Sequence, residues 1–151
     1  MAKIIFLDLD DTLSDFTGSE VFYGKFDVSH MFVPGFFLKL KPIEGSLMAV
    51  RQIIRMGYDV HILSQPVAES AHSYSEKIQW IGLWFPELIN KVHLTQDKGL
   101  FKGDYLIDDN PTKWKAPFEA NGGKFINFEY SKDHHSNWKD IVEFLREELN
   151  K

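Results

Sequence analysis

The sequence contains no cysteine among its 151 residues. This absence excludes disulfide bonds, thiolate metal sites and a cysteine nucleophile, and it is compatible with the cytoplasm, where we expect the protein to work. The chain also lacks an excess of positive charge, because its formal net charge is −5. A surface for a nucleic-acid polymer needs a dense positive field, so we expect no such partner. A small phosphorylated ligand remains compatible, because a local cation and a metal ion can outweigh the net charge.

Long apolar runs are missing as well. No run approaches the roughly eighteen residues that a membrane span requires, so we expect no membrane partner. Only the short segment 4–7 separates Lys3 from Asp8, which is too little for the core of a signal peptide. Hydrophobic residues make up 44% of the chain and charged residues 26%, as in globular proteins. We therefore expect a single domain over residues 1–151.

Apolar runs alternate along the chain with amphipathic segments. We expect strands over residues 4–9, 58–64, 91–95, 104–107 and 124–128, and helices over about 45–56, 67–82, 111–121 and from about 136 onward. This alternation predicts an α/β fold, a Rossmann-like parallel sheet with helices on both faces. Residues 14–44 lack a clear periodicity and are rich in aromatic side chains. We interpret them as a small helical cap inserted after the first strand.

Polar side chains follow the carboxyl ends of successive expected strands, where ligands bind in open parallel sheets. These residues are Asp8, Asp10, Ser64, Lys98, Asp108 and Asp109. Converging carboxylates repel one another, and a divalent cation relieves that repulsion. Hard oxygen ligands favour Mg²⁺, whereas the lack of cysteine and of a His-rich spacing disfavours zinc. The sequence therefore predicts a magnesium site at this edge of the sheet.

Asp8 and Asp10 are two residues apart, so continued strand geometry would place both carboxylates on the same face. One can then attack a phosphorus atom while the other serves the leaving group as an acid and later water as a base. Lys98 would hold phosphoryl oxygens and Ser64 would add a hydrogen bond. Taken singly, these residues have plainer explanations, such as a turn, a helix cap or a solvated surface charge. Their arrangement after successive strands favours catalysis.

These motifs resemble those of the haloacid dehalogenase superfamily of aspartate-nucleophile phosphatases. The segment Asp8-x-Asp10-x-Thr12 matches its first motif, and the other three are matched by Ser64, by Lys98 and by Asp108-Asp109. A closer resemblance is to 5′(3′)-deoxyribonucleotidases. It is carried by residues 15–16, 35–37, 40–43, 94–98 and 105–109. The chain differs from the family pattern at Asp11, Gln96 and Asn110, where Gly, Arg and a basic residue are common.

The resemblance implies that Asp8 forms an aspartyl-phosphate and that Asp10 protonates the leaving alkoxide and then activates water. It implies that Mg²⁺ is held by the Asp8 carboxylate, the Asp10 backbone carbonyl and Asp108, with Asp109 acting through water. The implied substrate is a deoxyribonucleoside monophosphate. Its base or sugar would pack on three aromatic residues of the cap, namely Phe16, Phe36 and Phe37. Alternatively, these aromatic side chains form only the small core of the cap itself.

Two other functions fit the residues less well. One is a related phosphatase for a sugar phosphate or another small phosphomonoester. The other is a receiver-like phosphoacceptor domain, but this class needs its phosphorylated aspartate at the end of a middle strand, and Asp59 begins its strand. We expect His61 to be packed and hydrogen-bonded within its strand, and His134-His135 to lie in a loop. Trp80, Trp84 and Phe85 are expected in the core, with a homodimer contact as the alternative.

Overall fold

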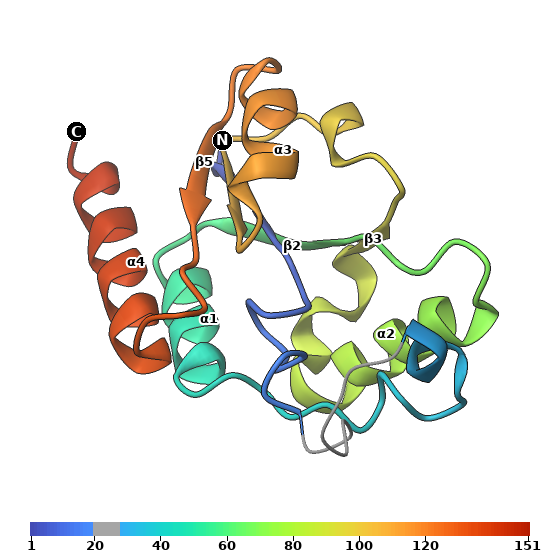
Figure 1. Ribbon diagram of the computed structural model, residues 1–151. Coiled ribbons are helices and arrows are strands. Elements are labelled where there is room, and N and C mark those ends of the chain that lie inside the picture. The colour runs from blue at the N-terminus through green and yellow to red at the C-terminus, as the bar shows by residue number, and fades with distance from the viewer. Residues whose placement is uncertain (20–27) are drawn as a thin grey trace.

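The computed structural model describes residues 1–19 and 28–151 and has an α/β fold (Figure 1). Its five strands are β1 (Ile4–Leu7), β2 (Asp59–Ser64), β3 (Val92–Leu94), β4 (Tyr105–Asp108) and β5 (Lys124–Asn127). All neighbouring strands are parallel, and their order is β3-β2-β1-β4-β5. The predicted Rossmann-like sheet is confirmed, with β1 at its centre.

Within the described residues, four α-helices connect or follow the strands, namely α1 (Ser46–Arg55), α2 (Ala71–Trp84), α3 (Pro111–Glu119) and α4 (His134–Leu149). Short 3-10 helices occupy Val28–Phe32, Pro86–Lys91 and Lys98–Leu100. Figure 1 shows α1 and α4 side by side, where the two helices contact each other. None of the helices in the described part of the chain is long and apolar enough to cross a membrane.

Side chains of β1 alternate between the two faces of the sheet, as strand geometry requires. Ile5 and Leu7 belong to a large core cluster that includes buried residues of α1, α2 and α4. Phe6 belongs to a second cluster with Trp114 and Phe118 of α3. Helices therefore cover both faces, as predicted.

The second face is also covered by two histidines. His61 Nδ1 and His93 Nε2 lie 3.0 Å apart in a hydrogen bond between β2 and β3. Both rings contact Phe6, at centroid distances of 5.9 and 6.0 Å. His61 Nε2 also lies 3.1 Å from Asp59 Oδ1. The prediction that His61 is a packed, hydrogen-bonded residue is confirmed.

Several boundaries differ from the predicted ones for local reasons. β1 ends at Leu7 because the chain then turns, with the N–H groups of Leu13 and Ser14 both donating to the Leu9 carbonyl. The last helix begins at His134 because the Asp133 carboxylate caps it by accepting from Ser136 N–H at 2.9 Å. His134-His135 consequently lie in the first turn of α4, and their predicted placement in a loop is wrong.

Gly57 follows the end of α1, with φ at +96°, a left-handed conformation that favours glycine. α2 begins at Ala71, later than expected, after its cap Ser70. Trp80 and Phe85 are buried in the core as predicted. Trp84 is 36% exposed, so its predicted place in the core is wrong. The homodimer contact stays a prediction.

The predicted cap, residues 14–44, includes residues 20–27, which lie outside the described residues. The ends of the segment run side by side, because Asp15 N–H donates to the Lys41 carbonyl and Ile43 N–H donates to the Leu13 carbonyl. Phe36, Phe37 and Leu40 form a small buried cluster of their own, against which further apolar side chains pack. The segment thus leaves the sheet and returns to it at one place, at the carboxyl end of β1.

Candidate active site

Three predicted site residues converge at the centre of the sheet edge. Lys98 Nζ donates to Asp8 Oδ1 at 2.8 Å and to Asp108 Oδ2 at 2.6 Å. Lys98 and Asp108 are each 1% exposed and Asp8 is 7% exposed. Asp8 directly follows β1, and its N–H donates to the Ile107 carbonyl of β4 at 2.9 Å, which holds it beside Asp108. The ammonium therefore lies between two carboxylates in a dry environment.

Asp109 completes the acidic group. One carboxylate oxygen from each of Asp8, Asp108 and Asp109 lies within 4.8 Å of the others. All three donors are hard oxygen atoms, which Mg²⁺ and Ca²⁺ prefer, and neither sulfur nor imidazole is among them. The donor set fits a hard divalent cation.

The electrostatics of this group follow from its burial. Burial raises the pKa of Asp8, but the Lys98 charge and hydrogen bonds to Asp109 and Lys98 outweigh it, and the pKa is lower than usual. Burial and the charge of Asp8 raise the pKa of Asp108 to about 6. The same causes raise the pKa of Asp109 to about 9. At neutral pH the Asp8 carboxylate is therefore ionised, whereas Asp109 keeps its proton in the absence of a cation.

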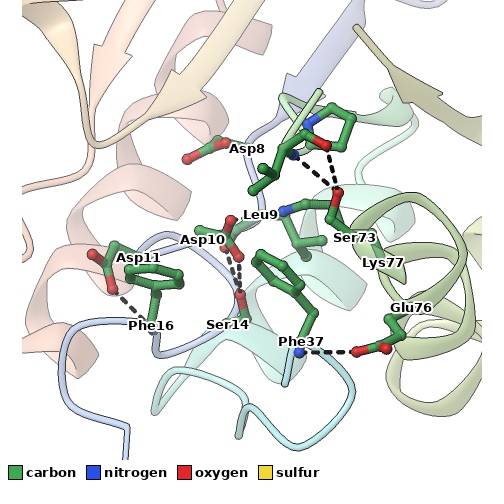
Figure 2. Close-up of polar contacts among 12 residues, drawn as sticks. Asp8, Leu9, Asp10, Asp11, Ser14, Phe16, Phe37, Ser73, Glu76 and Lys77 are labelled. Carbon is green, nitrogen blue, oxygen red and sulfur yellow. Dashed lines mark hydrogen bonds and ion pairs between the residues drawn. The ribbon is translucent and has the colours of Figure 1, made fainter. Parts of the chain in front are cut away.

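Asp10 is not part of this acidic group, and its partner was missed by the sequence analysis. Lys77 reaches Asp10 from α2, with Nζ 2.7 Å from Oδ2, while Ser14 Oγ donates to Oδ1 at 3.2 Å (Figure 2). The Lys77 side chain is only 1% exposed. The signal was its position, because Lys77 shares the buried face of α2 with Trp80 and Ile81. A charged residue within an apolar helical stripe needs a partner.

Asp11 lies in the turn that leads from Asp8 and Asp10 into the cap, and it has φ at +60°. This left-handed conformation is uncommon for a residue with a side chain and costs about 1 kcal/mol. The Asp11 carboxylate offsets that cost by accepting hydrogen bonds from Phe16 N–H at 3.0 Å and from Thr17 N–H at 2.8 Å. Figure 2 shows the bond that ties Phe16 to Asp11. Asp11, which stands where the family commonly has Gly, thus fixes the start of the cap.

A pocket of about 350 Å³ opens beside Asp10. Phe16 and Phe37 line it, as does Met31. Phe36 packs against Phe37, with ring centroids 4.9 Å apart, and does not line the pocket. Phe16 and Phe37 thus line the pocket, while Phe37, only 3% exposed, also belongs with Phe36 to the buried core of the cap.

A row of polar side chains forms another part of the pocket wall. Gln65 follows Ser64, which is buried at the end of β2. Gln65 Nε2 donates to Gln96 Oε1 at 3.1 Å, and Lys113 Nζ donates to Gln65 Oε1 at 2.6 Å. These contacts join the loops after β2 and β3 to the first turn of α3. Asn110, another departure from the family pattern, caps that helix by accepting from Lys113 N–H at 3.1 Å.

The last helix, α4, also contacts the loop that follows β1. Trp138 of α4 is 1% exposed, and its Nε1 donates to the Thr12 carbonyl at 3.2 Å. The Thr12 hydroxyl in turn donates to Asp8 Oδ2 at 3.2 Å. The loop that carries Asp8 is therefore held from α4 as well as from β4.

The fold has a known counterpart in a haloacid dehalogenase-like family hydrolase from Xanthomonas campestris. The two structures agree with a TM-score of 0.59 over 99% of this chain and 98% of the other, at 15% sequence identity. The sheet order and this likeness define the class of the fold, which is that of haloacid dehalogenase-like hydrolases. Within it, residues 25–147 match the family described as 5′ nucleotidase, deoxy (pyrimidine), cytosolic type C protein, and the chain belongs to that family. The match begins after Asp8 and Asp10, so it does not include these two residues.

Proteins with similar sequences have names that contain the term 5′(3′)-deoxyribonucleotidase. The human 5′(3′)-deoxyribonucleotidase, cytosolic type, is 40% identical over 129 residues, which cover 75% of this chain and 64% of the relative. The mouse mitochondrial 5′(3′)-deoxyribonucleotidase is 35% identical over 78 residues, covering 50% of this chain and 36% of the relative. A Bordetella bronchiseptica relative is 38% identical over 79 residues and is covered to 42% of its length. The chain thus spans only part of each relative.

Proposed function

We propose that the protein is a magnesium-dependent phosphomonoesterase that removes the phosphate from deoxyribonucleoside monophosphates through an aspartyl-phosphate. The observation that carries this proposal is the ionised Asp8 beside Lys98, with Asp10 next to an aromatic pocket. The names of the relatives support the substrate class. We propose the cytoplasm as its location, in line with the cytosolic-type human relative.

In the first step, an Asp8 oxygen attacks phosphorus and a new P–O bond forms while the bond to the leaving oxygen breaks. Asp10 gives its proton to that oxygen, and the deoxynucleoside therefore leaves as a neutral alcohol. Lys98 already contacts Asp8 Oδ1 at 2.8 Å and would also stabilise charge on the phosphoryl oxygens. Ser64, buried at the end of the neighbouring strand, would donate to another phosphoryl oxygen.

In the second step, Asp10 takes a proton from water, and the water oxygen attacks the phosphorus of the aspartyl-phosphate. The bond between Asp8 and phosphorus breaks, which releases inorganic phosphate and returns both carboxyl groups to their starting states. Lys77 at 2.7 Å and Ser14 at 3.2 Å hold the Asp10 carboxylate in one orientation during both transfers. This double anchoring suits a group that must exchange its proton twice at one place.

Asp8, Asp108 and Asp109 would hold Mg²⁺, with the Asp10 backbone carbonyl as a further ligand. When bound, the ion neutralises charge on the phosphoryl group and offsets the repulsion among the carboxylates. Lys98 provides one positive charge, which it shares between Asp8 and Asp108. Since Asp109 adds a third carboxyl group, a bound cation would supply the further positive charge that the group needs.

The cap, residues 14–44, would provide selectivity. Phe16 and Phe37 line the pocket beside Asp10 and offer two ring surfaces to a base or a deoxyribose. An apolar wall near the sugar would leave a 2′-hydroxyl without a partner, which disfavours ribonucleotides by about 1–3 kcal/mol. Phe36 would act indirectly, by supporting Phe37 from behind.

The test is a panel of phosphomonoesters with magnesium, which includes matched ribonucleotides, deoxyribonucleotides and sugar phosphates. We expect deoxynucleotides to have the highest kcat/KM. If sugar phosphates are turned over as well or better, the related sugar phosphatase becomes the correct assignment. Asp8→Asn should abolish turnover while the fold persists. Asp140→Asn is the matched control, because Asp140 is an exposed residue of α4. Substantial activity of Asp8→Asn would refute the nucleophile.

A receiver-like signalling domain is disfavoured by the position of Asp59. This residue begins β2, at the opposite end from Ser64, and its carboxylate contacts Lys91 Nζ at 2.6 Å. A stable phosphoprotein that does not turn over in the presence of magnesium would nevertheless favour the signalling function over the phosphatase.

A further inference from the structure

The cap is attached to α2 by a buried carboxylate. Glu76 is 5% exposed. Its Oε2 accepts a hydrogen bond from Gly35 N–H at 2.8 Å, and its Oε1 accepts from Phe37 N–H at 3.0 Å and from Leu38 N–H at 3.3 Å. Figure 2 shows the bond between Glu76 and Phe37. One side chain of α2 therefore orders a whole turn of the cap.

The next residue of the helix contacts the catalytic acid. Lys77 binds Asp10 at 2.7 Å, and its Nζ lies 4.6 Å from the centroid of the Phe37 ring. Phe37 is thus held twice by adjacent residues of α2, by its N–H at Glu76 and by its ring at Lys77. One turn further, Trp80 Nε1 donates to the Leu40 carbonyl at 2.7 Å. The same face of α2 sets the position of the cap and of Asp10.

We propose that Glu76 is a positioning residue for substrate selectivity: it holds the turn at residues 35–38 so that Phe37 faces a nucleobase or deoxyribose beside Asp10. This inference rests on the proposed function. Glu76 acts through Phe37, one of the residues that line the pocket. Because the chemistry belongs to Asp8, Asp10 and Lys98, a change at Glu76 should alter which substrate is preferred more than how fast a small one reacts.

Glycine at position 35 supports the same conclusion. Gly35 has φ at +88°, so the turn adopts a backbone conformation that residues with a side chain rarely take. Its N–H is the closest of the three donors to Glu76. Two features therefore stabilise the turn. Gly35 can adopt its backbone conformation, and the Glu76 carboxylate accepts hydrogen bonds from its N–H groups.

Glu76→Gln tests the proposal, because the amide keeps the size of the side chain but has one acceptor oxygen where the carboxylate has two. The two substrates are deoxythymidine 5′-monophosphate and deoxyribose 5-phosphate, which have the same leaving oxygen and differ in the base. We expect the ratio of their kcat/KM values to fall by about tenfold or more, mainly through a higher KM for the nucleotide. The kcat for deoxyribose 5-phosphate should stay within about twofold of the wild-type value. Loss of folded protein alone would lower both activities equally and leave the ratio unchanged.

Two further variants complete the experiment. Glu87→Gln is the matched control, since Glu87 pairs only with exposed Arg51 at 3.4 Å in the described contacts and should leave the ratio unchanged. Gly35→Ala strains the same turn while Glu76 stays intact, so it should lower the ratio in the same direction, even if Glu76→Gln folds poorly. If the wild type favours the nucleotide but neither variant changes the ratio, the role of Glu76 is refuted while the nucleotidase stands. If the wild type does not distinguish the two substrates, the proposed function fails and the inference fails with it.

Discussion

Replacing Lys98 by methionine removes the cation between Asp8 and Asp108 while keeping most of the side-chain volume. The two ion pairs, at 2.8 and 2.6 Å, are shielded from solvent, because Lys98 and Asp108 are each 1% exposed. At an effective dielectric constant of about 20, each contact corresponds to roughly 6 kcal/mol of Coulomb attraction, most of which is offset by desolvation. Removing one partner of a buried pair typically costs about 3–5 kcal/mol. We expect Lys98→Met to lower the free energy of unfolding by that amount at about pH 8 in a chelator.

The size of this loss should depend on pH. Without Lys98 the two carboxylates repel, so the pKa of Asp8 is no longer held below its usual value and the pKa of Asp108 rises further above it. Groups with raised folded pKa values stabilise the fold at low pH, and that contribution is lost as the pH rises through the folded pKa. The loss in Lys98→Met should therefore be smaller at about pH 5 than at about pH 8.

Urea unfolding of the wild type and the variant at both pH values measures these differences. Lys113→Met is the matched control, because in the described structure the Lys113 ammonium contacts only the neutral side-chain amide of Gln65 and the Trp114 ring. A loss in Lys98→Met below about 1 kcal/mol at the higher pH, the value of a surface pair, would refute the reasoning. A loss that does not change with pH would refute the assignment of the repulsion to Asp8 and Asp108.

Three other predictions concern the same site. In a chelator, the wild type should lose stability from about pH 5 to about pH 8, because the folded pKa values of Asp108 and Asp109 are raised to about 6 and about 9. Magnesium at a hundred times its Kd should restore about 2.7 kcal/mol at the higher pH, and a flat thermal-shift profile would contradict this. Lys77→Met should slow hydrolysis of alkyl phosphates by about 10²-fold and of p-nitrophenyl phosphate much less, because Asp10 is then misplaced as an acid; equal losses in the kinetic assay would contradict it. Trp138→Phe leaves the Thr12 carbonyl without its partner and should cost about 1–3 kcal/mol by urea unfolding, with an unchanged midpoint as the opposing result.

The centre of the site could be predicted because it depends on strand order alone. Asp8, Ser64 and Asp108 end or follow strands, and parallel strands bring their carboxyl ends to one edge whatever the side chains between them do. Lys98 follows the same rule, since it lies in the loop after β3.

The partner of Asp10 could not be predicted by that rule. Lys77 lies in the middle of α2 and reaches the site only because the helix places its buried face against the cap. Glu76 faces backbone N–H groups of the cap, and such partners leave no mark in the sequence. The division between Phe36 in the core of the cap and Phe37 in the pocket also depends on the local turn. These contacts are tertiary, and neither composition nor periodicity contains them.

The central position of β1 delays its complete pairing while the chain is being synthesised. Leu7 pairs with Ile62 on one side and with Ile107 on the other. At a translation rate of about 5–20 residues per second, the nascent strand waits roughly 5–20 s for its second neighbour. During that interval an apolar segment with at least one free edge is open to other nascent chains. Lys3 and Asp8 flank this segment with opposite charges, so the carboxylate assigned to catalysis also opposes aggregation before the site exists.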